Sequence, residues 1–153
     1  MKEAELNQLT ERVIGLAIEV HRNLGPGLLE SVYESALCIE FETAGIRHER
    51  QKLLVVSYKG RPVGEFRADL LVEDSLLLEL KSVERHDPVF EAQVLTYLKI
   101  SGRHLGLLIN FNTRLLKDGI VAAPGTPEEF GAFIANEIEV VRKIVARAGI
   151  KIE

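Results

Sequence analysis

The chain is organised around one stretch, Phe66-Arg-Ala-Asp-Leu-Leu-Val-Glu-Asp-Ser-Leu-Leu-Leu-Glu-Leu-Lys81. Leucine-rich runs flank the polar Glu73-Asp74-Ser75, which predicts two short strands joined by a three-residue turn. Because side chains alternate along a strand, this register assigns each residue to a face of the hairpin. The apolar face carries Phe66, Ala68, Leu70, Val72, Leu76, Leu78 and Leu80. The other face carries Arg67, Asp69, Leu71, Leu77, Glu79 and Lys81.

Two carboxylates face each other on the second face. Directly opposed side chains lie about 4.5–5.5 Å apart at Cβ, and like charges there repel. The pairing of Asp69 with Glu79 is therefore unfavourable unless a positive charge lies between them. A divalent cation would supply it, because two carboxylates with waters are ordinary ligands for Mg²⁺. Lys81, on the same face, could reach a phosphate or an attacking water. The alternative is a surface hairpin with scattered charges, and a turn shorter by one residue would move Glu79 and Lys81 to the opposite face.

The composition indicates one globular domain spanning residues 1–153, with 46% apolar and 27% charged residues. No apolar run approaches the ~18 residues of a membrane span, and the N-terminus has no signal-peptide pattern. A single cysteine, Cys38, suits a reducing compartment, so we expect a cytoplasmic protein with a buried structural thiol. The net charge of −4 implies that any binding of nucleic acid uses a local basic patch or a bound metal.

Periodicity predicts the remaining elements. Asp87 and Pro88 are typical of a helix start. The nearly all-apolar residues 104–111 predict a central strand. The helix should connect this strand to residues 76–81 by a right-handed parallel crossover. The predicted order is a helix at 2–22, a helix at 28–43, a strand at 47–58, the two hairpin strands, a helix at 88–101, a strand at 104–111, an edge strand at 120–121 and a helix at 126–148.

This order resembles the PD-(D/E)XK nuclease superfamily, and three motifs carry the resemblance. Asp69 with Glu79-Leu80-Lys81 resembles the metal-and-lysine signature, and Gln93-Val-Leu-Thr-Tyr97 resembles the Q-x-x-x-Y motif of the RecB-like branch. Gly27-Leu-Leu-Glu30-Ser-Val-Tyr33 matches the motif of the small bacterial GxxExxY family. The resemblance implies a restriction-endonuclease-like α/β fold: a mixed central sheet flanked by helices in αβββαβ order, with an extra C-terminal helix.

The resemblance also implies a role for each site residue. Asp69, Glu79 and the backbone carbonyl of Leu80 would bind Mg²⁺ or Mn²⁺, and Glu30 would complete the shell directly or through water. Lys81 would position the attacking water or stabilise the transition state. Three residues would orient the substrate or support the ligands: Tyr97, Tyr33 and Arg67. Gln93 would orient Lys81 or a phosphate.

Some positions favour other interpretations. Glu30 near a helix start also complements the helix dipole. Arg67 faces Lys81 in the predicted register, and extension of both side chains into solvent is favoured over a shared anion. Ala68 and Phe90 depart from the family pattern, which has a proline at the first position and often a histidine at the second.

The implied function is metal-dependent hydrolysis of DNA phosphodiester bonds, in repair, recombination or defence. An alternative from a different functional class is a catalytically inactive binding or regulatory module on a nuclease fold. The acidic pI, the small size and Phe90 favour this alternative. Hydrolysis of another phosphate ester also stays open, because fold does not fix substrate. The expected partner is DNA, with no membrane. We expect a homodimer, since a chain this small needs a second copy to cut both strands of a duplex.

Overall fold

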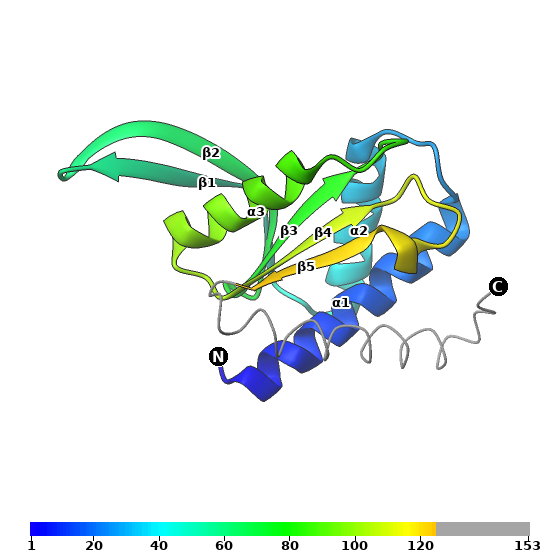
Figure 1. Ribbon diagram of the computed structural model, residues 1–153. Helices are drawn as coiled ribbons and strands as arrows, with labels where there is room; N and C mark the ends of the chain where they lie inside the picture. Colours follow the sequence, from blue (N-terminus) through cyan, green and yellow to red (C-terminus); the bar gives the residue numbers. More distant parts are fainter. Residues whose placement is uncertain (125–153) are drawn as a thin grey trace.

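The computed structural model describes residues 1–124, which form one mixed five-stranded sheet with the strand order β1-β2-β3-β4-β5 (Figure 1). The elements are α1 (Glu3–Leu24), α2 (Glu30–Ala44), β1 (His48–Tyr58), β2 (Arg61–Val72), β3 (Leu76–Lys81), α3 (Pro88–Ser101), β4 (Leu105–Asn110), the 3-10 helix η1 (Leu116–Gly119) and β5 (Ile120–Pro124). The predicted mixed α/β architecture is confirmed. The helix predicted for 126–148 lies outside the described residues, and the extent of the domain stays a prediction.

The central hairpin has the predicted register. Val72 pairs with Leu76, and Leu70 pairs with Leu78. Glu73 and Asp74 close the turn with φ angles of +49° and +53°, the left-handed pair that joins antiparallel strands tightly. Arg47 stabilises this turn, because its backbone N–H and its guanidinium both donate to the Glu73 carboxylate.

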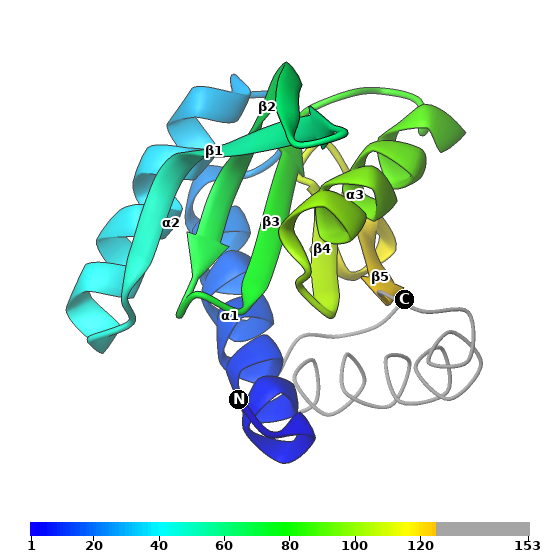
Figure 2. The ribbon, with the colours of Figure 1, turned by 90° about the vertical axis from the view of Figure 1, so that its left-hand side faces the viewer.

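Helices cover both faces of the sheet (Figure 2). The helices α1 and α2 pack on one face and enclose the main core, which includes Leu70, Leu78, Leu80, Leu107 and Ile109. On the other face, α3 encloses a smaller core that includes Leu71, Leu77, Val94, Tyr97 and Leu108. Strands β3 and β4 are parallel and buried at all but their last residues, as predicted for central strands connected by a helix.

The predicted faces of the hairpin are wrong at one end. Ala68 lies in the smaller core, and the Phe66 ring lies 5.7 Å from that of Tyr97 on α3, so both residues lie on the side opposite to Leu70. The cause is a break in the alternation at Asp69, where the paired strand β1 carries Gln51 with a φ of +51°. Arg50 still pairs with Leu70 and Lys52 with Ala68, but regular pairing is interrupted between them.

Beyond this break, β1 and β2 continue past α3 as an arched two-stranded ribbon (Figure 1). We call residues 52–67 of this ribbon the arm. Its turn is Lys59-Gly60, and both residues have positive φ angles.

Two smaller sequence expectations concern Cys38 and membrane spans. Cys38 is buried, as predicted, and burial raises the pKa of its thiol above the ordinary value, which disfavours the reactive thiolate. Within residues 1–124, the structure has no helix that combines the length and the hydrophobicity needed to cross a membrane.

Candidate active site

The predicted pair of carboxylates lies where β2 and β3 separate. Regular pairing of these strands ends at Leu70 and Leu78. At the next position the side chains replace the ladder: the Asp69 N–H donates to Glu79 Oε1 over 3.0 Å, and the Leu80 N–H donates to Asp69 Oδ2 over 2.7 Å. Each carboxylate is thus held by the backbone of the opposite strand, and the two face each other as the sequence predicted.

This pair is electrostatically unfavourable without a cation. Glu79 is only 5% exposed, and burial, followed by the charge of Asp69, raises its pKa to about 8, although Lys81 acts in the opposite direction. Burial likewise raises the pKa of Asp69, against hydrogen bonds from Leu80 and Gln51. A divalent cation would favour ionisation of both groups, which is the response expected of metal ligands.

The donor set fits a hard divalent ion. The backbone hydrogen bonds use one oxygen of each carboxylate. Oε2 of Glu79 and Oδ1 of Asp69, which accepts one long bond from Gln51, are then further oxygen ligands for a metal ion. The Lys81 carbonyl accepts a hydrogen bond from Phe111, at the end of β4. Because carbonyls alternate along a strand, the Leu80 carbonyl points the other way, towards the gap beside Asp69. Oxygen donors of this kind suit Mg²⁺ or Mn²⁺.

Glu30 does not join this pair in a compact cluster. No three His, Cys, Asp or Glu side chains within residues 1–124 come close enough together to hold a metal ion. Glu30 lies exposed at the first position of α2, and its charge contributes to the raised pKa values of Asp69 and Glu79. Its predicted ligation through water stays a prediction.

Lys81 packs against an aromatic ring. Its Nζ lies 4.6 Å from the centroid of Phe90, a cation–π contact. Phe90 thus contacts the lysine of the predicted signature at the position where the family often has a histidine. His86, four residues earlier, contacts Glu91 instead, with its Nε2 2.7 Å from Glu91 Oε1.

Two polar residues that sequence reasoning missed connect α2 to the site. The side chain of Gln51 donates to Glu34 Oε1 over 2.8 Å and, over a long 3.4 Å, to Asp69 Oδ1. Arg50 donates to the other oxygen of Glu34 over 2.9 Å, so this buried carboxylate is paired. Glu34 falls one helical turn after Glu30, which is a usable sequence signal. Gln51 is placed by its positive φ, for which the sequence has no signal.

Tyr33 is a structural residue in this arrangement. It is fully buried, and its ring stacks on Phe111 with centroids 4.4 Å apart. Its hydroxyl donates to the Gly25 carbonyl over 2.6 Å and accepts from the Leu28 N–H over 3.1 Å. Tyr33 therefore holds the loop that precedes Glu30 and α2.

The other predicted residues lie nearby with different surroundings. Tyr97 is buried in the smaller core, and its pKa is raised by burial and then by the charges of Glu79 and Asp69. Gln93 lies one turn earlier on α3 and is half-buried. The Arg67 guanidinium donates to the Gln51 carbonyl over 3.3 Å, and regular pairing of β2 with β3 does not extend to an Arg67–Lys81 pair.

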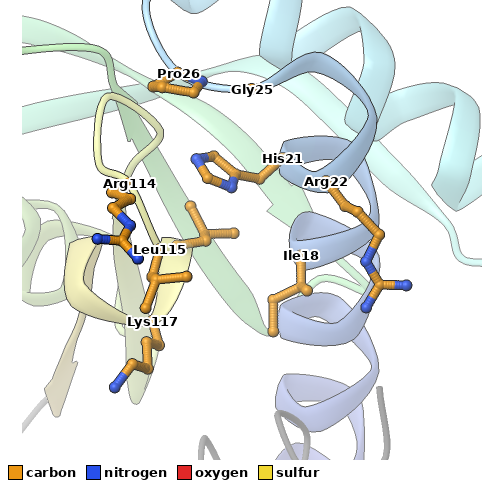
Figure 3. Close-up of a pocket in the computed structure, with 9 residues that line it drawn as sticks. Ile18, His21, Arg22, Gly25, Pro26, Arg114, Leu115 and Lys117 are labelled. Atoms are coloured by element: carbon orange, nitrogen blue, oxygen red, sulfur yellow. The ribbon is translucent and has the colours of Figure 1, made fainter. Parts of the chain in front are cut away.

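Two cavities lie near the loop that Tyr33 holds. A cavity of about 620 Å³ is lined by residues 27–31, Ser82, Glu84 and Asn112, and so borders Glu30. A second, of about 300 Å³, lies between the end of α1 and residues 114–117 (Figure 3). Arg22 and Lys117 extend to opposite sides of it in Figure 3, so these two cations do not converge. The lining of this cavity includes neither Asp69 nor Glu79.

The solved structures similar to this chain include two of the alkaline exonuclease LHK-Exo from Laribacter hongkongensis. One is 14% identical, with 90% of this chain and 87% of that chain covered and a TM-score of 0.45. The other, in complex with dAMP, is 15% identical, with 90% and 93% covered and a TM-score of 0.41. No curated protein matches the chain.

Comparison with protein families gives a match over most of the described residues. The sequence model of the PD-(D/E)XK nuclease superfamily matches residues 7–122, which include both carboxylates, Lys81, Gln93 and Tyr97. The chain belongs to the PD-(D/E)XK nuclease superfamily.

Proposed function

We propose that this protein is a Mg²⁺- or Mn²⁺-dependent nuclease that hydrolyses phosphodiester bonds of DNA, in repair, recombination or defence. The observation that carries the proposal is the reciprocal pair of Asp69 and Glu79, fixed by the backbone and buried, with the pKa of Glu79 raised to about 8. A protein that uses this pair only for stability gains little from it, because two adjacent buried carboxylates repel each other.

Each residue has a specific task in this proposal. Asp69, Glu79 and the Leu80 carbonyl would hold the ion, which when bound supplies Lewis acidity to a scissile phosphate and to a water. Lys81, two residues after Glu79, donates a hydrogen bond to a phosphate oxygen or to the attacking water. Gln93 orients Lys81 or the phosphate from α3. Tyr97 packs behind the site and keeps water away from Glu79.

Two further statements belong to the proposal. The finer placement in the RecB-like branch and the GxxExxY family rests on the motifs at residues 93–97 and 27–33. A homodimer in the cytoplasm would give two sites for the two strands of a duplex.

Titration calorimetry with Mn²⁺ tests the metal site directly. Wild type should bind, and the Asp69→Asn/Glu79→Gln double variant should not, because it removes both charges while keeping an oxygen at each backbone hydrogen bond. The matched control is Glu49→Gln/Glu65→Gln, which removes one exposed carboxylate from β1 and one from β2. Retained binding in the double variant, with or without an added oligonucleotide, would contradict the proposed site.

A second candidate is a binding module without catalysis. Phe90 in contact with Lys81, together with the lack of a third close carboxylate in residues 1–124, favours it. Such a module would bind DNA with salt-dependent affinity and leave it uncut in Mn²⁺. Cleavage by wild type that disappears in Lys81→Met would exclude this candidate.

A further inference from the structure

Beyond Leu54 and Phe66, which contact the smaller core at its base, the arm lacks the packing that stabilises the rest of the sheet. It projects past α3 (Figure 1), and Leu54 is the one buried residue among residues 52–67. Apolar side chains are left in solvent along it, with Val55 45% exposed and both Tyr58 and Val63 64% exposed. A two-stranded ribbon is only marginally stable by itself, and exposed apolar patches mark interaction surfaces. These features indicate that the arm contacts a partner.

The charge of the arm identifies the kind of partner. The arm has four basic residues and one carboxylate, a net charge of +3: Lys52, Lys59, Arg61, Arg67 and Glu65. The other 137 residues have 15 basic and 22 acidic side chains, a net charge of −7. A polyanion such as DNA is therefore attracted to the arm and, on average, repelled by the rest of the chain.

The arm is also continuous with the candidate active site. Strand β2 carries both, and Arg67 lies two residues before Asp69. At about 3.3 Å per residue, Arg61 lies at most about 26 Å from Asp69 along the strand. Each DNA strand advances 3.4 Å per nucleotide, so this reach corresponds to about eight base pairs. A two-stranded ribbon also fits the major groove, which is about 12 Å wide.

We propose that the arm binds duplex DNA in the major groove on one side of the cleavage site. Lys59 and Arg61 contact phosphates about eight base pairs from the scissile bond. Tyr58, whose ring lies 5.5 Å from Lys59 Nζ, supplies apolar contact with sugars or thymine methyl groups. This assignment rests on the proposed nuclease function, because a scissile phosphate at Asp69 places the duplex along β2.

Binding across a salt series tests the proposal with the full chain. Fluorescence anisotropy of a 30-base-pair duplex is measured in EDTA, which prevents metal-dependent cleavage. The Lys59→Gln/Arg61→Gln variant should lower the slope of log K against log salt by about 1.8, at 0.9 per phosphate contact, and Arg61→Gln alone by about 0.9. Lys2→Gln/Arg12→Gln, which removes one exposed cation from the N-cap of α1 and one from α1 itself, should keep the wild-type slope.

Hydroxyl-radical footprinting of the same duplex locates the contacts. Wild type should protect backbone sites about eight base pairs to one side of the cleavage position, and the Lys59→Gln/Arg61→Gln variant should lose this distal protection while keeping the proximal part. A wild-type slope and footprint in the variant would overturn the arm assignment. The arm assignment would also be overturned if sedimentation velocity showed a dimer for wild type and a monomer for the variant, because the arm would then join two copies of the chain.

Failure of the arm assignment differs from failure of the nuclease proposal. If wild type cuts DNA in Mn²⁺ and the arm variants bind with the wild-type slope, only the arm assignment fails. If wild type neither binds nor cuts DNA, the proposed function itself fails, and the arm assignment fails with it.

Discussion

In the absence of a bound divalent cation, the stability of this protein should fall as the pH rises, mainly through the carboxyl group of Glu79. The pKa of Glu79 is about 8 in the folded protein, against an ordinary value of 4.5. Between these values the folded protein keeps a proton that the unfolded chain releases, so a rise in pH favours unfolding. At 1.36 kcal/mol for each pH unit of the gap, the free energy of unfolding should fall by about 4–5 kcal/mol between pH 4.5 and pH 8.

Urea denaturation followed by circular dichroism, in EDTA at pH 5 to 9, measures this loss. Glu79→Gln removes the titrating group but keeps an oxygen that accepts a hydrogen bond from the Asp69 N–H. The free energy of unfolding of this variant should therefore not fall by 4–5 kcal/mol, and only the smaller pH dependence caused by other groups should stay. Glu65→Gln, which removes an exposed carboxylate from the neighbouring strand β2, should follow wild type. Mn²⁺ added at pH 8 should restore stability to wild type and not to Glu79→Gln. Parallel pH curves for wild type and Glu79→Gln would refute the reasoning.

Two substitutions separate structural residues from those that act on the reaction. Tyr33→Phe removes the hydroxyl that bonds to the Gly25 carbonyl and the Leu28 N–H, and should lower the free energy of unfolding in urea by about 1–3 kcal/mol. The control is Tyr58→Phe, on an exposed ring, which should change this free energy by nearly nothing. Equal losses of stability in the two variants would contradict the role given to Tyr33. Phe90→Leu removes the ring beneath the Lys81 ammonium, and a cation–π contact of about 0.5–2 kcal/mol corresponds to a 2- to 30-fold slower cleavage of DNA. Phe90→Leu should keep the Mn²⁺ affinity of wild type, and the control Phe90→Tyr should cleave DNA at the wild-type rate. Loss of metal binding in Phe90→Leu would show that the ring supports the carboxylates instead of Lys81.

The fold was predictable where one pattern determined the structure alone. The turn at residues 73–75 fixed the hairpin register, and the register placed Asp69 opposite Glu79. The all-apolar run of β4 and the Asp87-Pro88 helix start gave the parallel connection between β3 and β4. In each case the local signal and the tertiary packing favour the same arrangement.

The errors arise where the backbone departs from regular geometry. Strict alternation placed Ala68 and Phe66 with Leu70, but the break at Asp69 and Gln51 sends them to α3. Glutamine is not a residue whose type signals a positive φ, so no sequence pattern revealed the break or the contact of Gln51 with Glu34 and Asp69.

The end of the regular pairing between β2 and β3 also explains how the carboxylates of Asp69 and Glu79 are held in place. If β2 and β3 had continued their ladder, backbone groups would bond to each other, and the carboxylates of Asp69 and Glu79 would be free to move apart. Here the carboxylates accept hydrogen bonds from the N–H groups that the ladder would have used. Separating the charges would therefore leave part-buried N–H donors unsatisfied. Repulsion between the carboxylates is therefore relieved by protonation of Glu79 rather than by movement, which is why Gln and Asn substitutions separate the charge of this site from its geometry.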